Sequence, residues 1–164
     1  MGQDDTKHNL LFISKYPQII HEFTDAMKDR DIEIETAING IEAAAKIKKK
    51  NYDIVITGLS LEGYNGEQII TYLNKTAPST VCIIYTTTIS SAQLHFFINE
   101  RNVFRVFLRP VDFRGAFWEA LEEAYEYHAV QVKNEEDTGA RRQEQEKQER
   151  ETEIMEQRMR SQRQ

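Results

Sequence analysis

The sequence predicts an α/β protein built on a doubly wound, parallel five-stranded sheet, followed by a charged C-terminal helical extension. Between residues 9 and 132, short apolar runs alternate five times with amphipathic segments, as in parallel strands joined by right-handed crossover helices. Most of these runs are continuously apolar, which indicates strands buried on both faces. Residues 133–164 contain no Trp, Phe, Tyr, Leu or Val. We therefore expect the core to end near Lys133 and a helical or disordered tail to follow.

The five strands are expected where apolar residues cluster between turn signals. The second of them alternates apolar and acidic residues with period two, so it should be exposed on one face. A polar segment, residues 1–8, precedes the first strand. In chain order, the predicted strands cover residues 10–13, 32–35, 53–57, 81–86 and 103–108.

The intervening helices are expected where apolar residues recur at spacings of three and four. Ile20, Phe23 and Met27 form such a stripe after Pro17, and Asn39-Gly40 turns the chain into the next helix. In the last helix, the stripe that should face the sheet includes Phe117, Leu121 and Ala124. The predicted helices begin near residues 17, 41, 67, 92 and 113.

Composition excludes several classes of protein. A formal charge of -6 argues against nucleic-acid binding, because binding a phosphate polyanion requires clustered Lys and Arg. No apolar run approaches the roughly 20 residues of a membrane-spanning helix. Cys82 is the only cysteine, so no internal disulfide can form, and a reducing compartment is favoured. We expect a cytoplasmic protein that does not contact membranes.

The candidate site follows from the predicted topology. In doubly wound sheets, ligands bind at the carboxyl ends of the strands, beside the point where the strand order reverses. The residues that follow the predicted strands there include Ser14, Lys15, Gly58, Thr86 and Arg109.

Four motifs then point to a known family: Asn39-Gly40-Ile41-Glu42-Ala43, Tyr52-Asp53-Ile54-Val55-Ile56, Gly63-Tyr64-Asn65-Gly66 and Phe107-Leu108-Arg109-Pro110. Together they resemble a response regulator receiver domain over residues 9 to about 130. The resemblance implies a flavodoxin-like (βα)5 sheet in the order 2-1-3-4-5. It also implies bacterial two-component signal transduction, with a signalling protein or a fused output domain as partner.

The chain departs from the family at the positions that carry its chemistry. The resemblance places the family's Mg²⁺-binding acidic pair at Ser14 and Lys15, and its phosphoacceptor aspartate at Gly58. Thr86 keeps the family's hydroxyl position, and Arg109 replaces its lysine. This pattern predicts a degenerate pseudo-receiver that has kept phosphate-contacting groups and lost its metal site.

Two other carboxylates bear on the interpretation of this site. Glu62 follows the acceptor position and could neutralise Lys15 or Arg109. Asp53 could not replace the acceptor, because it begins the third strand, roughly 15 Å from Gly58 at about 3.3 Å per residue. We therefore interpret Asp53 as a structural carboxylate at the start of the strand.

The favoured hypothesis is a non-catalytic module that binds a protein partner without being phosphorylated. The resemblance places the contact face on the helix near residues 92–99, the strand 103–108 and the last helix, and it implies switch-like roles for Thr86 and Phe107. Large aromatic residues are common at interfaces. The aromatic side chains expected on this face are Phe97, Phe104, Trp118 and Tyr125.

Other hypotheses stay open. The vacated pocket could sense an anionic small ligand or a nucleotide through Ser14, Lys15, Thr86 and Arg109. No enzymatic activity, metal or cofactor is expected, since the sequence has no acidic cluster and no Gly-rich phosphate loop. The tail could be a solvated helix, or a short coiled coil that makes a homodimer, although its apolar residues are few.

Overall fold

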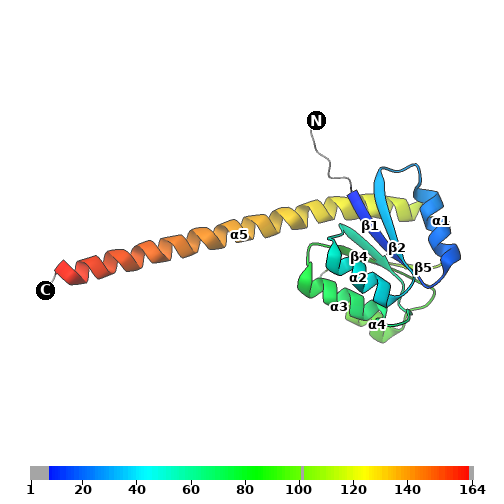
Figure 1. The fold of residues 1–164 in the computed structure, drawn as a ribbon, viewed down its shortest axis with the longest axis horizontal. Helices are drawn as coiled ribbons and strands as arrows, with labels where there is room; N and C mark the ends of the chain where they lie inside the picture. The colour runs from blue at the N-terminus through cyan, green and yellow to red at the C-terminus, as the bar shows by residue number, and fades with distance from the viewer. Residues whose placement is uncertain (1–7, 101, 163–164) are drawn as a thin grey trace. The chain divides into compact units, whose positions relative to one another are not determined.

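The computed structural model describes residues 8–100 and 102–162, and Figure 1 shows the order of its elements. The chain divides into two compact units, residues 1–129 and 130–164, which are described separately. The strands are β1 (His8–Ile13), β2 (Ile32–Ala37), β3 (Ile54–Thr57), β4 (Val81–Thr86) and β5 (Val103–Leu108). The helices are α1 (Pro17–Met27), α2 (Gly40–Lys49), α3 (Gly66–Thr76), α4 (Ser91–Asn99) and α5 (Ala116–Gln162).

The strands form one parallel sheet in the order β2-β1-β3-β4-β5, which confirms the predicted fold class. β1 is paired on both sides: Leu10 pairs with Ile34 of β2 on one side and with Ile54 of β3 on the other. The register between β4 and β5 shifts at Cys82 and Ile83. Strand order reverses between β1 and β3, so the carboxyl ends of these two strands flank the expected site.

Helices cover both faces of the sheet. On one face, Phe23 of α1 and Phe117 of α5 pack with Phe12 of the sheet in an aromatic cluster. On the other face, the core joins α2, α3 and α4 through Ala43, Ile70 and other side chains. The predicted α5 stripe is confirmed as core, because Phe117, Leu121 and Ala124 are fully buried.

Side-chain caps set the starts of three helices. The Asn39 side chain accepts a hydrogen bond from the backbone N–H of Glu42 at 2.8 Å, which starts α2. Asn65 with Gln68, and Ser90 with Gln93, form reciprocal capping boxes at the starts of α3 and α4. These caps satisfy backbone donors that would otherwise have no helical partner.

Element boundaries differ from the prediction mainly at the ends of the domain. β1 begins at His8 because its backbone pairs with β2 from that residue, although its first residues are polar. α5 begins at Ala116 and continues through the second unit to Gln162. Within that unit, the described side chains from residue 133 to residue 161 are all exposed.

Candidate functional site

A small pocket lies at the carboxyl ends of β1, β3, β4 and β5. Its volume is about 40 Å³. Five of the six residues predicted for the degenerate phosphorylation pocket line it: Ser14, Lys15, Gly58, Thr86 and Arg109. Each follows or ends a strand, so the parallel topology brings side chains from distant parts of the sequence to one edge of the sheet.

The pocket has two cationic side chains, and no acidic residue is among the described residues that line it. Lys15 Nζ donates a hydrogen bond to Ser60 Oγ at 3.3 Å. The Arg109 guanidinium lies 4.8 Å from the ring centre of Tyr16 and 5.8 Å from that of Tyr85. Burial raises the pKa of the Tyr85 hydroxyl, and the charge of Arg109 partly opposes that shift. The local field therefore favours an anion and disfavours a cation.

Glu62 does not take the role predicted for it. Its side chain is exposed, does not line the pocket and makes no ion pair with any described residue. Its backbone carbonyl instead accepts a hydrogen bond from Gly40 N at 2.9 Å, which holds the β3–α3 loop against the start of α2. The Lys15 ammonium instead contacts Ser60, and the Arg109 guanidinium contacts Tyr16 and Tyr85. No sequence motif points to these three residues.

The backbone at Gly58 leaves room for a side chain. Gly58 N donates to Ile13 O at 3.1 Å, which ties the end of β3 to the end of β1. A Cβ atom added at Gly58 would meet Tyr85 O at 3.6 Å and Ile13 O at 4.0 Å, which is ordinary van der Waals contact. Packing around Gly58 therefore does not itself exclude a carboxylate at this position.

The two switch-like positions are partly buried. Thr86 Oγ1 donates to Thr88 O at 3.1 Å, so its hydroxyl proton is held by the following loop. The Phe107 ring lies 4.8 Å from the Phe117 ring, centre to centre, and packs against the core beneath α5.

Two residues predicted for the interaction face are buried, and that part of the prediction is wrong. Phe97 is 2% exposed and packs in the core beneath α4. Tyr125 is 8% exposed, and its hydroxyl donates to Asn9 O at 3.0 Å. Helical spacing placed Trp118 and Tyr125 on a common side of α5, but it did not identify the neighbouring element on that side.

The other two predicted face residues are partly buried. The Phe104 ring packs against the Tyr127 ring at a centre-to-centre distance of 5.2 Å. Trp118 packs at the edge of the core, and the guanidinium of Arg30, from the loop between α1 and β2, lies 4.1 Å from its ring centre. Trp118 therefore faces the α1–β2 side of the domain. Large apolar side chains exposed on α4 and β5 are Leu94, Ile98 and Leu108.

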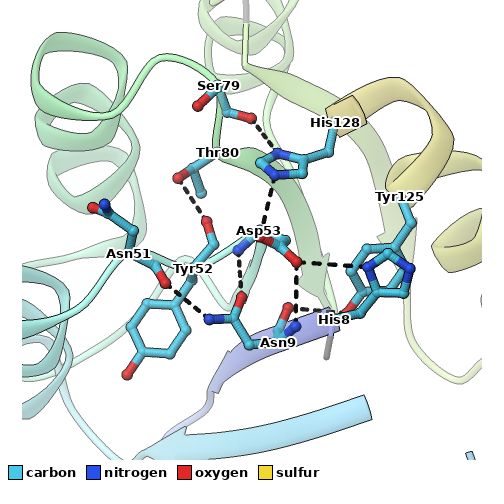
Figure 2. Close-up of polar contacts among 9 residues, drawn as sticks. All are labelled: His8, Asn9, Asn51, Tyr52, Asp53, Ser79, Thr80, Tyr125 and His128. Carbon is cyan, nitrogen blue, oxygen red and sulfur yellow. Dashed lines mark hydrogen bonds and ion pairs between the residues drawn. The ribbon is translucent and has the colours of Figure 1, made fainter. Parts of the chain in front are cut away.

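A second polar cluster lies at the amino-terminal edge of the sheet and is centred on Asp53 (Figure 2). His128 Nε2 lies 3.1 Å from Asp53 Oδ1, and His8 Nδ1 lies 3.7 Å from Oδ2. Asn9 and Asp53 also exchange hydrogen bonds between side chain and backbone. The prediction that Asp53 lies at the opposite end of β3 from Gly58 is confirmed.

Opposing effects act on the pKa of the Asp53 carboxyl. Burial by itself would raise its pKa, but the hydrogen bond to His128, the charges of His128 and His8, and the Asn9 N–H together hold the pKa below the usual value. No sequence pattern reveals this cluster, because His8 starts β1, Asp53 directly precedes β3 and His128 lies on α5. Only the folded sheet brings them together (Figure 2).

Among the residues that the structure describes, no group of three His, Cys, Asp or Glu side chains is arranged to hold a metal ion. None of the described helices combines the length and hydropathy needed to cross a membrane.

Comparison with known proteins agrees with this geometry. A family model for the response regulator receiver domain matches residues 11–134. A search of curated proteins found no match.

Solved structures share the fold at low sequence identity. The signal receiver domain of an HD domain-containing protein from Pseudomonas fluorescens Pf-5 is 19% identical, with a TM-score of 0.72, and the alignment covers 76% of this chain and 99% of that one. A CheY-like response regulator receiver domain protein from Methanospirillum hungatei JF-1 is 18% identical, with a TM-score of 0.70 and the same coverage of both chains. A structure described as adenylate cyclase from Rhodopirellula baltica is 19% identical, with a TM-score of 0.72, covering 80% of this chain and 96% of that one.

Proposed function

Because the chain belongs to the response regulator receiver family, we propose that it is a pseudo-receiver: a non-catalytic signalling module that binds a protein partner without being phosphorylated. The observation that carries this proposal is the absence of carboxylates from the described lining of its pocket. Ser14 and Lys15 stand at the positions of the family's acidic pair, and Gly58 stands at the position of its phosphoacceptor.

The charge of the pocket supports the same conclusion. A hard cation such as Mg²⁺ requires clustered oxygen ligands. This pocket instead contains the Lys15 ammonium and the Arg109 guanidinium, which repel a metal ion. Without the metal and the acceptor carboxylate, the domain has no route to the acyl phosphate on which signalling in the family depends.

The proposed contact face remains that of α4, β5 and α5, with a changed set of residues. Phe97 and Tyr125 are part of the core, so they support this face only from within. The side chains available to a partner are Leu94, Ile98 and Leu108, which are 42%, 72% and 50% exposed. Phe104 lies at the edge of the same face and is partly buried.

The alternative function is an anion sensor. Lys15 and Arg109, with the hydroxyls of Ser14 and Thr86, offer charge and donors to a phosphate-sized group. The cavity of about 40 Å³ is much smaller than the roughly 300–1,000 Å³ of typical small-molecule sites, so it does not accommodate a nucleotide. Pocket size therefore favours the interaction module.

Thermal unfolding separates the two functions. The full chain is melted in buffer, in inorganic phosphate, and in acetyl phosphate with Mg²⁺. The interaction module predicts the same midpoint in all three at matched ionic strength. A rise in inorganic phosphate that Arg109→Ala abolishes would instead support the sensor, and a rise that requires acetyl phosphate and Mg²⁺ would contradict the pseudo-receiver.

A further inference from the structure

A groove of about 640 Å³ lies between α5 and the loop that joins α1 to β2. Its lining residues all belong to the first unit. Ile32, Trp118 and Ala129 give it an apolar surface, whereas Tyr125 is only 8% exposed and lies against the His8 ring, 4.2 Å away between ring centres. Because β2 begins at Ile32, the groove lies toward the amino-terminal edge of the sheet, away from the pocket at the carboxyl edge.

Acidic side chains outnumber basic ones around the groove, where Arg30 and His8 are the basic residues in the lining. Four carboxylates line it: Asp29, Asp31, Glu122 and Glu126. Asp29, Glu122 and Glu126 make no ion pair with any residue that the structure describes. These three carboxylates beside an apolar surface create a negative potential that a cationic ligand would neutralise.

Arg30 indicates how a cation can be held in this groove. Its guanidinium lies 4.1 Å from the centre of the Trp118 ring, and no described carboxylate pairs with it. Trp is the best aromatic partner for a guanidinium, and such contacts strengthen where water is excluded. Trp118 and Glu122 are four residues apart, so an aromatic surface and a carboxylate lie side by side on one face of α5.

We propose that this groove is a docking site for an arginine-bearing amphipathic segment of a partner protein. An apolar side chain of that segment would cover Ile32 and Ala129, while its guanidinium groups would pair with Glu122 and Glu126 and stack beside Arg30 on Trp118. The charge complementarity of the rim selects a basic occupant over a neutral or acidic one. The inference goes beyond the proposed function, because it adds a second surface, on the α1–β2 side of α5.

Trp118 is also the reporter for the test, since it is the only tryptophan in the chain. The full-length protein is titrated with a synthetic helical peptide of arginine and leucine that contains no aromatic residue. A control peptide carries glutamate in place of every arginine. We expect a saturable change in Trp118 emission with the arginine peptide and none with the glutamate peptide. The affinity should fall as salt is added, because exposed charges are screened.

Paired variants on α5 locate the binding site. Glu122→Gln with Glu126→Gln removes two charges from the rim, and Glu119→Gln with Glu123→Gln removes two charges from the same helix outside the groove. The rim variant should weaken the arginine peptide by about tenfold, as expected for interface residues with large effects, and the control variant by less than about twofold. Trp118→Ala should weaken a fluorescently labelled peptide at least as much as the rim variant, measured by anisotropy.

Three outcomes would overturn the inference. The first is no saturable signal with the arginine peptide, and the second is an equal loss of affinity in the rim and control variants. The third is a Trp118 signal that changes with protein concentration alone, because the groove would then be filled by a second copy of the chain.

Repeating each titration with acetyl phosphate and Mg²⁺ tests the groove separately from the proposed function. Phosphate-dependent binding would contradict phosphorylation independence, whereas absent binding in both conditions would reject only the groove.

Discussion

His128 Nε2 lies 3.1 Å from Asp53 Oδ1, and Nδ1 of the same ring lies 2.8 Å from the carbonyl oxygen of Ser79 (Figure 2). Both partners are hydrogen-bond acceptors, so both contacts are favourable only when each ring nitrogen carries a proton. A neutral imidazole would place an unprotonated nitrogen against one of these oxygens. Protonation of both ring nitrogens would satisfy both acceptors, and the two contacts tie α5 to the starts of β3 and β4.

Removing this ring should destabilise the domain. Hydrogen bonds that involve a charged group contribute about 1.5–3 kcal/mol, and the side chains of His128 and Asp53 are only 17% and 27% exposed. We expect His128→Ala to lower the free energy of unfolding by about that amount in urea denaturation at neutral pH. His95→Ala removes an exposed histidine from α4 and should change it by less than about 0.5 kcal/mol. Equal effects of the two substitutions would contradict the role of His128.

The Asp53 carboxyl predicts a loss of stability in acid. Its pKa is lowered in the folded protein from an ordinary value of 3.8. Asp53 therefore stabilises the fold above pH 3.8, and this contribution is lost as the pH falls through the lower folded pKa. Urea denaturation between pH 5 and about pH 2 should show a steeper loss of stability for the parent than for Asp53→Asn. Parallel slopes would show that Asp53 does not contribute.

A close backbone contact predicts a strong effect at Gly66. A Cβ atom added there would lie 2.3 Å from Gly58 O and 3.0 Å from Leu59 Cα, so the β3–α3 loop would have to move. Gly66→Ala should lower the free energy of unfolding by about 1–3 kcal/mol, as overpacking does. Gly139→Ala is the matched control, because nothing lies within 4 Å of its added Cβ and alanine favours a helix. An unchanged free energy of unfolding in Gly66→Ala would contradict this close packing of the β3–α3 loop.

The vacated pocket predicts how receiver chemistry could be rebuilt. Gly58→Asp alone should fold, since its Cβ meets only ordinary contacts, and should not accept phosphate, since Lys15 still repels Mg²⁺. Combining it with Ser14→Asp and Lys15→Asp supplies three carboxylates and should allow phosphorylation by acetyl phosphate. Intact mass in acetyl phosphate and Mg²⁺ measures the result. Phosphorylation of the Gly58→Asp single variant would show that the acidic pair is dispensable here.

The fold could be predicted from sequence because local and global patterns agree. The apolar runs that form β4 and β5 begin and end where predicted. The stripe of Phe117, Leu121 and Ala124 identified the buried side of α5. The strand order followed from the family resemblance and could not have been obtained from periodicity alone.

The polar details were less predictable, because they depend on side chains from distant elements. From its position in the sequence, Glu62 could neutralise Lys15 or Arg109, but its side chain is exposed and only its carbonyl makes a structural contact, accepting from Gly40 N. The sequence predicts Tyr125 at the surface, but its ring is buried and its hydroxyl donates a hydrogen bond to Asn9 O. The two residues are 116 positions apart in the sequence. Helical spacing predicts which residues share one side of a helix, but it does not predict which element packs against that side.

The central claim, that this receiver-family domain acts without phosphorylation, is tested most directly by intact mass spectrometry of the full chain after incubation with acetyl phosphate and Mg²⁺. A phosphorylatable receiver domain is treated in parallel as a positive control. The account predicts no covalent phosphoryl group on this chain under conditions that modify the control. A stoichiometric gain of one phosphoryl group, lost on hydroxylamine treatment as an acyl phosphate would be, would contradict it.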